Sequence, residues 1–150
     1  MHARLFQLDA FTACRFTGNP AAVMLFETYP DDRTLQALAA ENNLAETAFV
    51  VSDGSDFRIR WFTPTVEVPL CGHATLASAA VVLERLEPAR ETVVFYSASG
   101  PLTVRRSERG YTMDFPARPC APAEAPPGLV AALGASVEET LWDGFNFVAR

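Results

Sequence analysis

The chain has 150 residues, of which 49% are hydrophobic and 20% are charged, and its formal net charge is −6. This composition is typical of one globular domain that can bury a core, and the 12 basic residues form no stripe that would favour nucleic acid. No run approaches the ~18 apolar residues of a membrane span, and the N-terminus lacks a signal-peptide core. We therefore expect a soluble, cytoplasmic protein that contacts neither nucleic acid nor membrane.

Three cysteines, Cys14, Cys71 and Cys120, lie far apart in the sequence. An odd number at wide spacing predicts neither a disulfide framework nor a pair of metal ligands, and it agrees with a reducing compartment. The sequence also shows no phosphate-binding glycine loop and no Ser-His-Asp set. We therefore expect no cofactor and no metal.

Alternation, caps and turn residues predict the elements in chain order. The first four expected strands cover residues 5–11, 21–26, 47–51 and 57–62. A helix is expected to begin at Asp31 or Asp32, both capable of capping, and to end at Asn42-Asn43. Three further strands are expected at residues 91–96, 102–105 and 111–115, the last two as a hairpin.

The stretch from Pro69 to Leu86 organises these elements. Pro69 and Gly72 mark its start, and no polar face follows until Glu84. A helix that is apolar all round is a buried one, so we expect a central helix over residues 72–86 with strands around it. The free amides of its first residues, Gly72, His73 and Ala74, together with the helix dipole, would make an anion site.

A Pro-rich stretch follows the predicted hairpin. Residues 116–127 contain five prolines, which is typical of a stiff extended linker rather than a core element. A short helix at 129–133, closed by Gly134, and a strand at 145–148 come after it. We expect an N-terminal lobe over residues 1–115, a linker over 116–127 and the start of an incomplete second lobe over 128–150, so that the chain either breaks off in that lobe or lacks it.

Three places could carry chemistry. Glu46 stands where a helix passes into a strand, where a carboxylate could act as general acid/base, although a solvated strand-edge glutamate is the simpler interpretation. At the start of the central helix, the thiol of Cys71 is expected to have a lowered pKa, and His73 could orient or protonate a ligand. A small buried cysteine and a capping histidine are the alternative. Asn19 could offer its amide to a ligand, although a turn residue is the more usual role.

Five motifs together resemble the phenazine-biosynthesis (PhzF-like) family, within the diaminopimelate-epimerase-like superfamily. They occur in the family's order and spacing, and they are Asp9–Thr12, Gly18–Val23, Asn43–Val50, Arg60–Pro64 and Glu67–Thr75. The resemblance covers residues 1 to about 115 well. It implies an α+β fold in which a twisted, mainly antiparallel sheet wraps around a central buried helix, with the ligand in a cleft between two such lobes.

The same resemblance implies a function. The family includes isomerases that move a proton within a small cyclic amino acid, without cofactor or metal. By resemblance, Glu46 matches the catalytic glutamate, His73 matches a histidine that contacts the ligand beside the amides of Gly72 and Ala74, and Asn19 matches a residue that lines the cleft. We expect a small carboxylate-bearing substrate as partner and a homodimer as the oligomer to test.

Two departures from the family keep other interpretations open. Ala45 replaces the serine that the phenazine enzyme carries before its glutamate, which makes the phenazine precursor a doubtful substrate. Cys71 stands where the epimerase branch keeps one of two catalytic cysteines. The alternatives are therefore an epimerase or racemase that uses Cys71 as one of two bases, and an inactive, truncated binding module.

Overall fold

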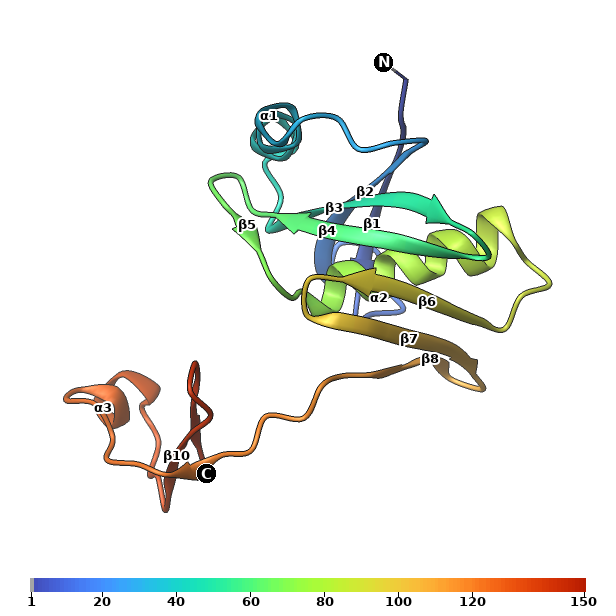
Figure 1. The fold of residues 1–150 in the computed structure, drawn as a ribbon. Helices are drawn as coiled ribbons and strands as arrows, with labels where there is room; N and C mark the ends of the chain where they lie inside the picture. The colour runs from blue at the N-terminus through green and yellow to red at the C-terminus, as the bar shows by residue number, and fades with distance from the viewer. Residues whose placement is uncertain (1) are drawn as a thin grey trace. The chain divides into compact units, whose positions relative to one another are not determined.

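The computed structural model describes residues 2–150, and the chain divides into two compact units between Phe115 and Pro116 (Figure 1). The first unit holds one curled sheet with a helix on each face. Its strands are β1 Arg4–Ala10, β2 Asn19–Phe26, β3 Glu46–Asp53, β4 Asp56–Phe62, β5 Glu67–Val68, β6 Thr92–Ser97, β7 Gly100–Ser107 and β8 Gly110–Asp114.

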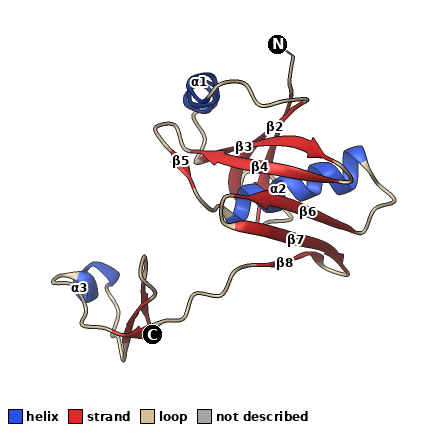
Figure 2. Cartoon of the chain, in the orientation of Figure 1, coloured by secondary structure: helices blue, strands red, loops and turns tan. Residues whose placement is uncertain are grey.

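The sheet runs in the order β1-β2-β3-β4-β6-β7-β8, with β5 paired to β4 outside this path. Parallel pairing joins β2 to β3 and β4 to β6, and the other neighbours are antiparallel. Each parallel pair is joined by a connection that contains a helix, as a parallel crossover requires. The predicted α+β architecture, a mainly antiparallel sheet curled around a central helix, is confirmed (Figure 2).

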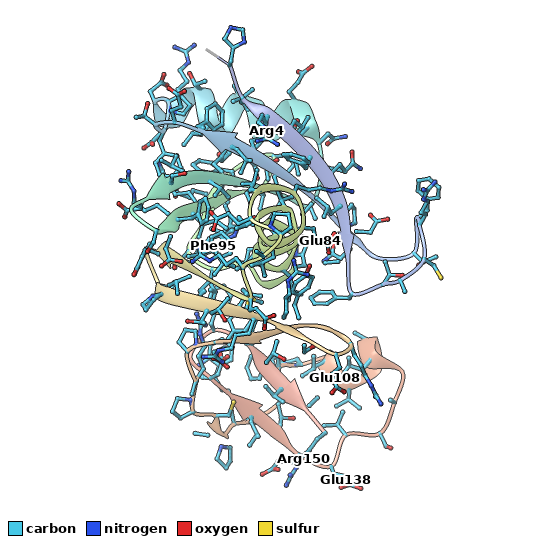
Figure 3. All side chains as sticks on the ribbon, turned by 90° about the vertical axis from the view of Figure 1, so that its right-hand side faces the viewer. Arg4, Glu84, Phe95, Glu108, Glu138 and Arg150 are labelled. Atoms are coloured by element: carbon cyan, nitrogen blue, oxygen red, sulfur yellow. The ribbon has the colours of Figure 1, made fainter. Side chains whose placement is uncertain are left out.

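The central helix α2 runs from Gly72 to Val81 and continues as a π-helical turn, Val82–Leu86. Figure 3 shows it nearly end-on, with the strands of the sheet curving around it. The predicted helix over 72–86 is therefore present, but its last turn is wider than expected, because the amide of Glu87 donates to the carbonyl of Val82. A guanidinium nitrogen of Arg106, on β7, donates to the carbonyl of Leu83 inside this turn.

The strands surround α2 on most sides but leave one stripe of the helix uncovered. Leu76 and Ala80 are half-buried, and with Glu84 and Tyr111 they line a hollow of ≈ 580 Å³. The reason is topological, because β1 and β8 end the sheet and are not paired with each other. The curled sheet is open along this seam.

The second helix, α1 Asp32–Asn42, lies on the other face of the sheet (Figure 1). Strand β3 separates two cores, because successive side chains point to opposite faces. Ala48 and Val50 pack with the α2 core, whereas Phe49 and Val51 pack with Leu35 of α1. A strand buried on both faces reads as a continuous apolar run, and the sequence from Ala48 to Val51 shows this.

The second unit, Pro116–Arg150, contains a small sheet and a short helix. Its elements are β9 Ala121–Pro122, α3 Leu129–Leu133, β10 Thr140–Trp142 and β11 Phe147–Ala149. The sequence predicts α3 and the strand nearest the C-terminus but misses β9, inside the Pro-rich stretch, and β10. No residue of α3 is buried, and the role of residues 116–127 as a linker stays a prediction. Among the described helices, none has the length and apolar character needed to cross a membrane.

Candidate functional site

The starts of β2 and β3 place the first candidate residues. Because these strands are parallel, both begin at the same end of the sheet. Ala21 of β2 is in register with Glu46 of β3. Glu46 is two residues before Ala48, so its side chain shares the α2 face. Helix α1 ends at Asn43, whose backbone has the left-handed conformation, and β3 begins shortly after it at Glu46. Glu46 is thus the first residue of a strand and points toward the central helix.

The N-terminus of α2 lies opposite Glu46. The loop before it is held by β5, which pairs with β4, and by Ser99, whose hydroxyl donates to the carbonyl of Pro69 at 2.8 Å. Cys71 is the N-cap residue in extended conformation, and its side chain makes no capping hydrogen bond. The hydroxyl of Thr75 donates to the carbonyl of Cys71 at 2.5 Å, so this buried polar side chain is satisfied. The first amides of α2 are left without a side-chain cap.

Glu46, Cys71 and His73 converge at this point. The Nε2 atom of His73 lies 3.3 Å from Oε2 of Glu46, and its Nδ1 atom lies 3.5 Å from Sγ of Cys71. One ligand-type atom from each of the three side chains lies within 4.8 Å of the others. The imidazole is only 8% exposed, and its Nε2 atom is too poorly aligned with Glu46 to form a hydrogen bond. The site therefore holds a buried polar nitrogen without a hydrogen-bond partner among the described residues.

The electrostatics of Cys71 contradict the expectation from its helix position. Burial raises the pKa of the Cys71 thiol to about 12, while the nearby amides of Ala74 and His73 lower it and the charge of Glu46 raises it further. The local rule that a helix N-terminus lowers a thiol pKa fails here, because removal from water outweighs the dipole. The thiol stays protonated at neutral pH, so it can donate to Nδ1 of His73, which leaves the Nε2 proton facing Glu46.

The other predicted residues lie at the same end of the unit with fewer contacts. Asn19, the first residue of β2, shares the α2 face with Ala21 by alternation, but among the described residues its side chain makes no hydrogen bond. A Cβ on Gly72 would lie 3.0 Å from the ring of Phe115, which places this exposed ring beside the start of α2. Phe115 was not predicted as a site residue, and only the fold brings it to the start of α2.

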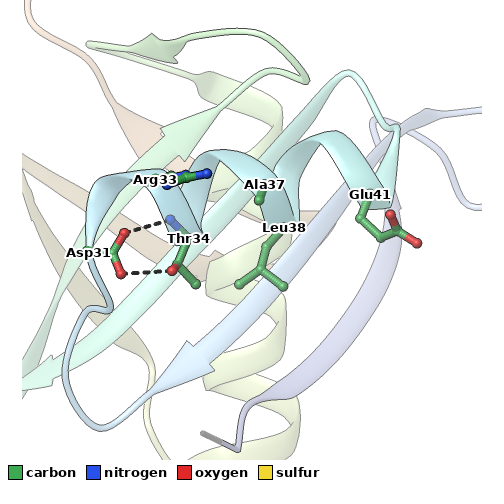
Figure 4. Close-up of a pocket in the computed structure, with 6 residues that line it drawn as sticks. All are labelled: Asp31, Arg33, Thr34, Ala37, Leu38 and Glu41. Carbon is green, nitrogen blue, oxygen red and sulfur yellow. Dashed lines mark hydrogen bonds between the residues drawn. The ribbon is translucent and has the colours of Figure 1, made fainter.

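A hollow elsewhere on the first unit does not carry this chemistry. It measures ≈ 680 Å³ along α1 and is lined by Asp31, Arg33, Thr34, Ala37, Leu38 and Glu41 (Figure 4). Asp31 already accepts from the amide and hydroxyl of Thr34, so the end of this helix is closed. We therefore place the candidate site at α2.

Comparison with known proteins identifies the family. A family model described as phenazine biosynthesis-like protein matches residues 8–144. The chain belongs to this family. It is 51% identical over 141 residues to an uncharacterized isomerase of Pseudomonas aeruginosa, covering 94% of this chain and 54% of the relative. It is 46% identical over 132 residues to the human phenazine biosynthesis-like domain-containing protein, covering 83% of this chain and 46% of the relative.

Solved structures of PhzF-family proteins share the fold. A PhzF-family protein from Enterococcus faecalis matches with a TM-score of 0.86 and 42% identity, over 97% of this chain and 55% of that protein. A predicted epimerase from Pseudomonas aeruginosa matches with a TM-score of 0.63 and 30% identity, over 73% of this chain and 41% of that protein. The chain thus spans about half the length of the relatives it matches.

Proposed function

We propose that this PhzF-like chain supplies the acid/base group and the carboxylate anchor of an isomerase that relocates a proton on a small amino-acid-like substrate. The observation that supports this most directly is the placement of Glu46 within 3.3 Å of His73 at the uncapped start of α2. A carboxylate and an anion-binding helix end at one place can hold a substrate carboxylate next to the base that takes its proton. The relative from Pseudomonas aeruginosa named an isomerase supports the same class.

In this proposal Glu46 is the general acid/base. It is the one carboxylate of the trio, and its side chain is 22% exposed, so it is partly shielded and still reachable from solvent. His73 fits a role as hydrogen-bond donor to the substrate or to Glu46, because its Nε2 atom is buried and without a partner. The carboxylate would take a proton from one carbon and return it to another, a step that needs no electron carrier.

The substrate carboxylate is proposed to bind at the amides of Gly72, His73 and Ala74. These amides begin a ten-residue helix without a side-chain cap. Asn19, on the same face, is proposed to line the pocket. A cytoplasmic location, a homodimer and the lack of nucleic-acid and membrane partners stay predictions.

An epimerase that uses Cys71 as a base is the rival function. Its support is the position of Cys71 at 3.5 Å from His73. The raised pKa of the thiol, about 12, speaks against it, because a base must be deprotonated when it accepts a proton. We therefore favour Glu46 and assign Cys71 no proton transfer to the substrate.

The test compares Glu46→Gln, Cys71→Ala and the control Glu41→Gln, which changes an exposed carboxylate on α1. Small amino acids are incubated with the protein in heavy water, and proton migration and deuterium uptake are followed by NMR. We expect Glu46→Gln to lower turnover by ~10²–10⁴-fold with binding largely kept, because the amide keeps its shape but accepts no proton. Full activity in Glu46→Gln together with loss of activity in Cys71→Ala would reject the proposal and favour the rival.

A one-base mechanism makes a further difference in the same experiment. If Glu46 alone carries the proton, part of the original substrate hydrogen should remain in the product. A two-thiol mechanism should instead deliver deuterium from solvent at the opposite face. Complete deuteration at the new position in the unmodified protein would count against a single carboxylate.

A further inference from the structure

The three side chains at the start of α2 are also ligands that divalent transition metals prefer. A thiol, an imidazole and a carboxylate come from two elements, β3 and the start of α2. Cys71 and His73 are 7% and 8% exposed, so two of the three groups are held in place by packing. Cys71 lies against Nδ1 of His73, at 3.5 Å, whereas Glu46 lies against Nε2 of the same ring, at 3.3 Å.

We propose that Glu46, Cys71 and His73 form a binding site for a thiophilic divalent metal ion of the Zn²⁺ type, and that the bound ion inhibits the isomerase. The metal binding stands on the geometry alone, whereas the inhibition rests on the proposed function of Glu46. Three protein ligands would leave the fourth position of a tetrahedral ion to water or to a small carboxylate.

Two of the three ligands are at a distance that fits such an ion, and the third has to move. With Zn–S of about 2.3 Å and Zn–N of about 2.0–2.1 Å, tetrahedral S and N ligands lie about 3.6 Å apart. Sγ of Cys71 and Nδ1 of His73 are 3.5 Å apart, so an ion can sit between them with little change. The ligand-type atoms of the trio all lie within 4.8 Å. The Glu46 oxygen lies 3.3 Å from Nε2 and has to move toward the Nδ1 side of the ring to complete the set.

Glu46 is the ligand that can make this movement. Its side chain is 22% exposed, and among the described residues it accepts no hydrogen bond that would have to break. The same exposure gives an ion a path from solvent, which a fully buried cluster would not offer. Packing thus fixes the thiol and the imidazole, while the carboxylate closes on the ion.

Coordination involves one proton and no change in oxidation state. The Cys71 S–H bond breaks, the sulfur lone pair binds the ion, and the proton passes to solvent, so affinity should rise with pH. A carboxylate that coordinates an ion has its lone pair engaged and cannot accept the proton of a substrate. Metal and substrate therefore compete for Glu46, and removal of the ion should restore activity.

The experiment uses Co²⁺ as the probe, because thiolate coordination to this ion gives a charge-transfer absorption in the near ultraviolet. We expect the chain to take up one Co²⁺ with this band, and Zn²⁺ to displace it. Cys71→Ala should abolish the band and weaken binding by more than ~100-fold, since loss of a direct ligand should exceed the ~10–100-fold cost of an outer partner. Glu46→Gln should keep the band and bind more weakly.

A matched control removes the cysteine and histidine side chains that lie outside the proposed site. Cys14 and Cys120 are exposed free thiols and His2 is exposed, so the triple variant C14A/C120A/H2A tests whether they hold the ion. We expect this variant to bind Co²⁺ as the unmodified chain does. A band that survives Cys71→Ala, a band lost in the triple variant, or no band at micromolar Co²⁺ would each overturn the metal site.

A second experiment measures turnover and tests whether the bound ion inhibits the isomerase. One equivalent of Zn²⁺ should abolish proton migration, and a chelator should restore it. Unchanged turnover with the ion bound would overturn the inhibition. A Co²⁺ band in a protein that moves no proton in any tested amino acid would support the metal site and count against the proposed isomerase, so the two failures are distinguishable.

Discussion

The two α-helices of the first unit use opposite solutions at their N-termini. In α1, Asp31 accepts from the amide of Thr34 at 2.9 Å and from its hydroxyl at 2.8 Å, so the helix end is closed by its own side chain (Figure 4). In α2, Cys71 occupies the same cap position and makes no capping bond. A closed end contributes stability, whereas an open end keeps amides for a ligand. The helix that lacks a cap is the one that faces Glu46.

The two helices also differ in how much of their surface is buried. Helix α1 fully buries only one stripe, Leu35 and Ala39, and its other residues are half-buried or exposed. Helix α2 buries seven of its ten residues and leaves only a narrow stripe at the seam of the sheet. The helix that builds the core therefore also presents the candidate site, which ties site geometry to core packing. Changes along α2 should be felt in stability, and changes at its first turn should be felt in binding.

The largest effect on stability is expected from a charge in the buried side of α2. Ala79 is 0% exposed, so Ala79→Glu should cost at least ~3 kcal/mol, because the carboxylate would be buried without a partner. Ala80→Glu, one position along, should cost about 1 kcal/mol or less, since it faces the open seam, where Glu84 one turn later repels it slightly.

The control for this pair lies on α1. Ala40 is exposed, so Ala40→Glu should change the free energy of unfolding by about 0.5 kcal/mol or less. Urea unfolding of the three variants measures the order. Equal losses for Ala79→Glu and Ala80→Glu would show that the seam is closed in solution.

Much of this difference between the helices is readable from sequence. The bounds of α1 follow from Asp31 and Asn43, which act as the expected cap and stop. The burial of α2 follows from its missing polar face, and the alternation of Phe57 to Phe62 predicts β4. Local rules suffice here, because each signal and its consequence lie within a few residues.

What sequence reasoning misses depends on contacts between distant segments. Glu46 and His73 are 27 residues apart in the sequence, and they meet because the fold brings the start of β3 beside the start of α2. The predicted direction of the Cys71 pKa shift is wrong, because the helix dipole is a local effect whereas burial depends on the whole unit. The open seam beside Ala80 follows from which strands end the sheet, and no pattern within α2 shows it.

The cap of α1 supplies the next test. Asp31→Ala should lower the free energy of unfolding by about 1 kcal/mol, within the 0.5–2 kcal/mol measured for lost caps, because the amide of Thr34 loses its acceptor. Ligand binding at α2 should not change. Asp31→Asn, which keeps an acceptor, should recover most of the loss in thermal unfolding. A variant without any cap that is as stable as the original would deny Asp31 this role.

The buried thiol of α2 makes stability depend on pH. Burial raises the pKa of Cys71 from 9.0 to about 12, so the native state holds the proton more tightly than the unfolded chain. The stabilisation is fully present below pH 9 and is lost as pH rises from 9 toward 12. At pH 10 the loss is already about 1 kcal/mol relative to neutral pH.

Cys71→Ala isolates this contribution. Tyr29 and Tyr111 also have raised pKa values through burial, and Tyr111 reaches about 12, so they add a loss of the same sign at high pH. Denaturant titrations at pH 8 and pH 10 should therefore show a smaller decline in Cys71→Ala than in the unmodified chain. An identical decline in both proteins would mean that the thiol is not buried in solution.

The smallest effect concerns the open amides themselves. Ala74 and Thr34 occupy the third position of their helices, but only the amide of Thr34 has a cap partner. Ala74→Pro removes one free amide and should weaken carboxylate binding by about 2- to 30-fold, corresponding to ~0.3–2 kcal/mol of dipole and hydrogen-bond energy. Thr34→Pro should instead lower stability and leave binding unchanged.

Ala74 is fully buried, so the larger proline ring could disturb packing at this position. A second measurement therefore uses the unmodified protein. On titration with a small carboxylate, the backbone amide NMR signals of Gly72, His73 and Ala74 should shift together, while that of Thr34 should stay in place because Asp31 already occupies it. Shifts at Thr34, or none at the start of α2, would move the anchor away from the uncapped helix. The contrast between a closed and an open helix end would then have no bearing on substrate binding.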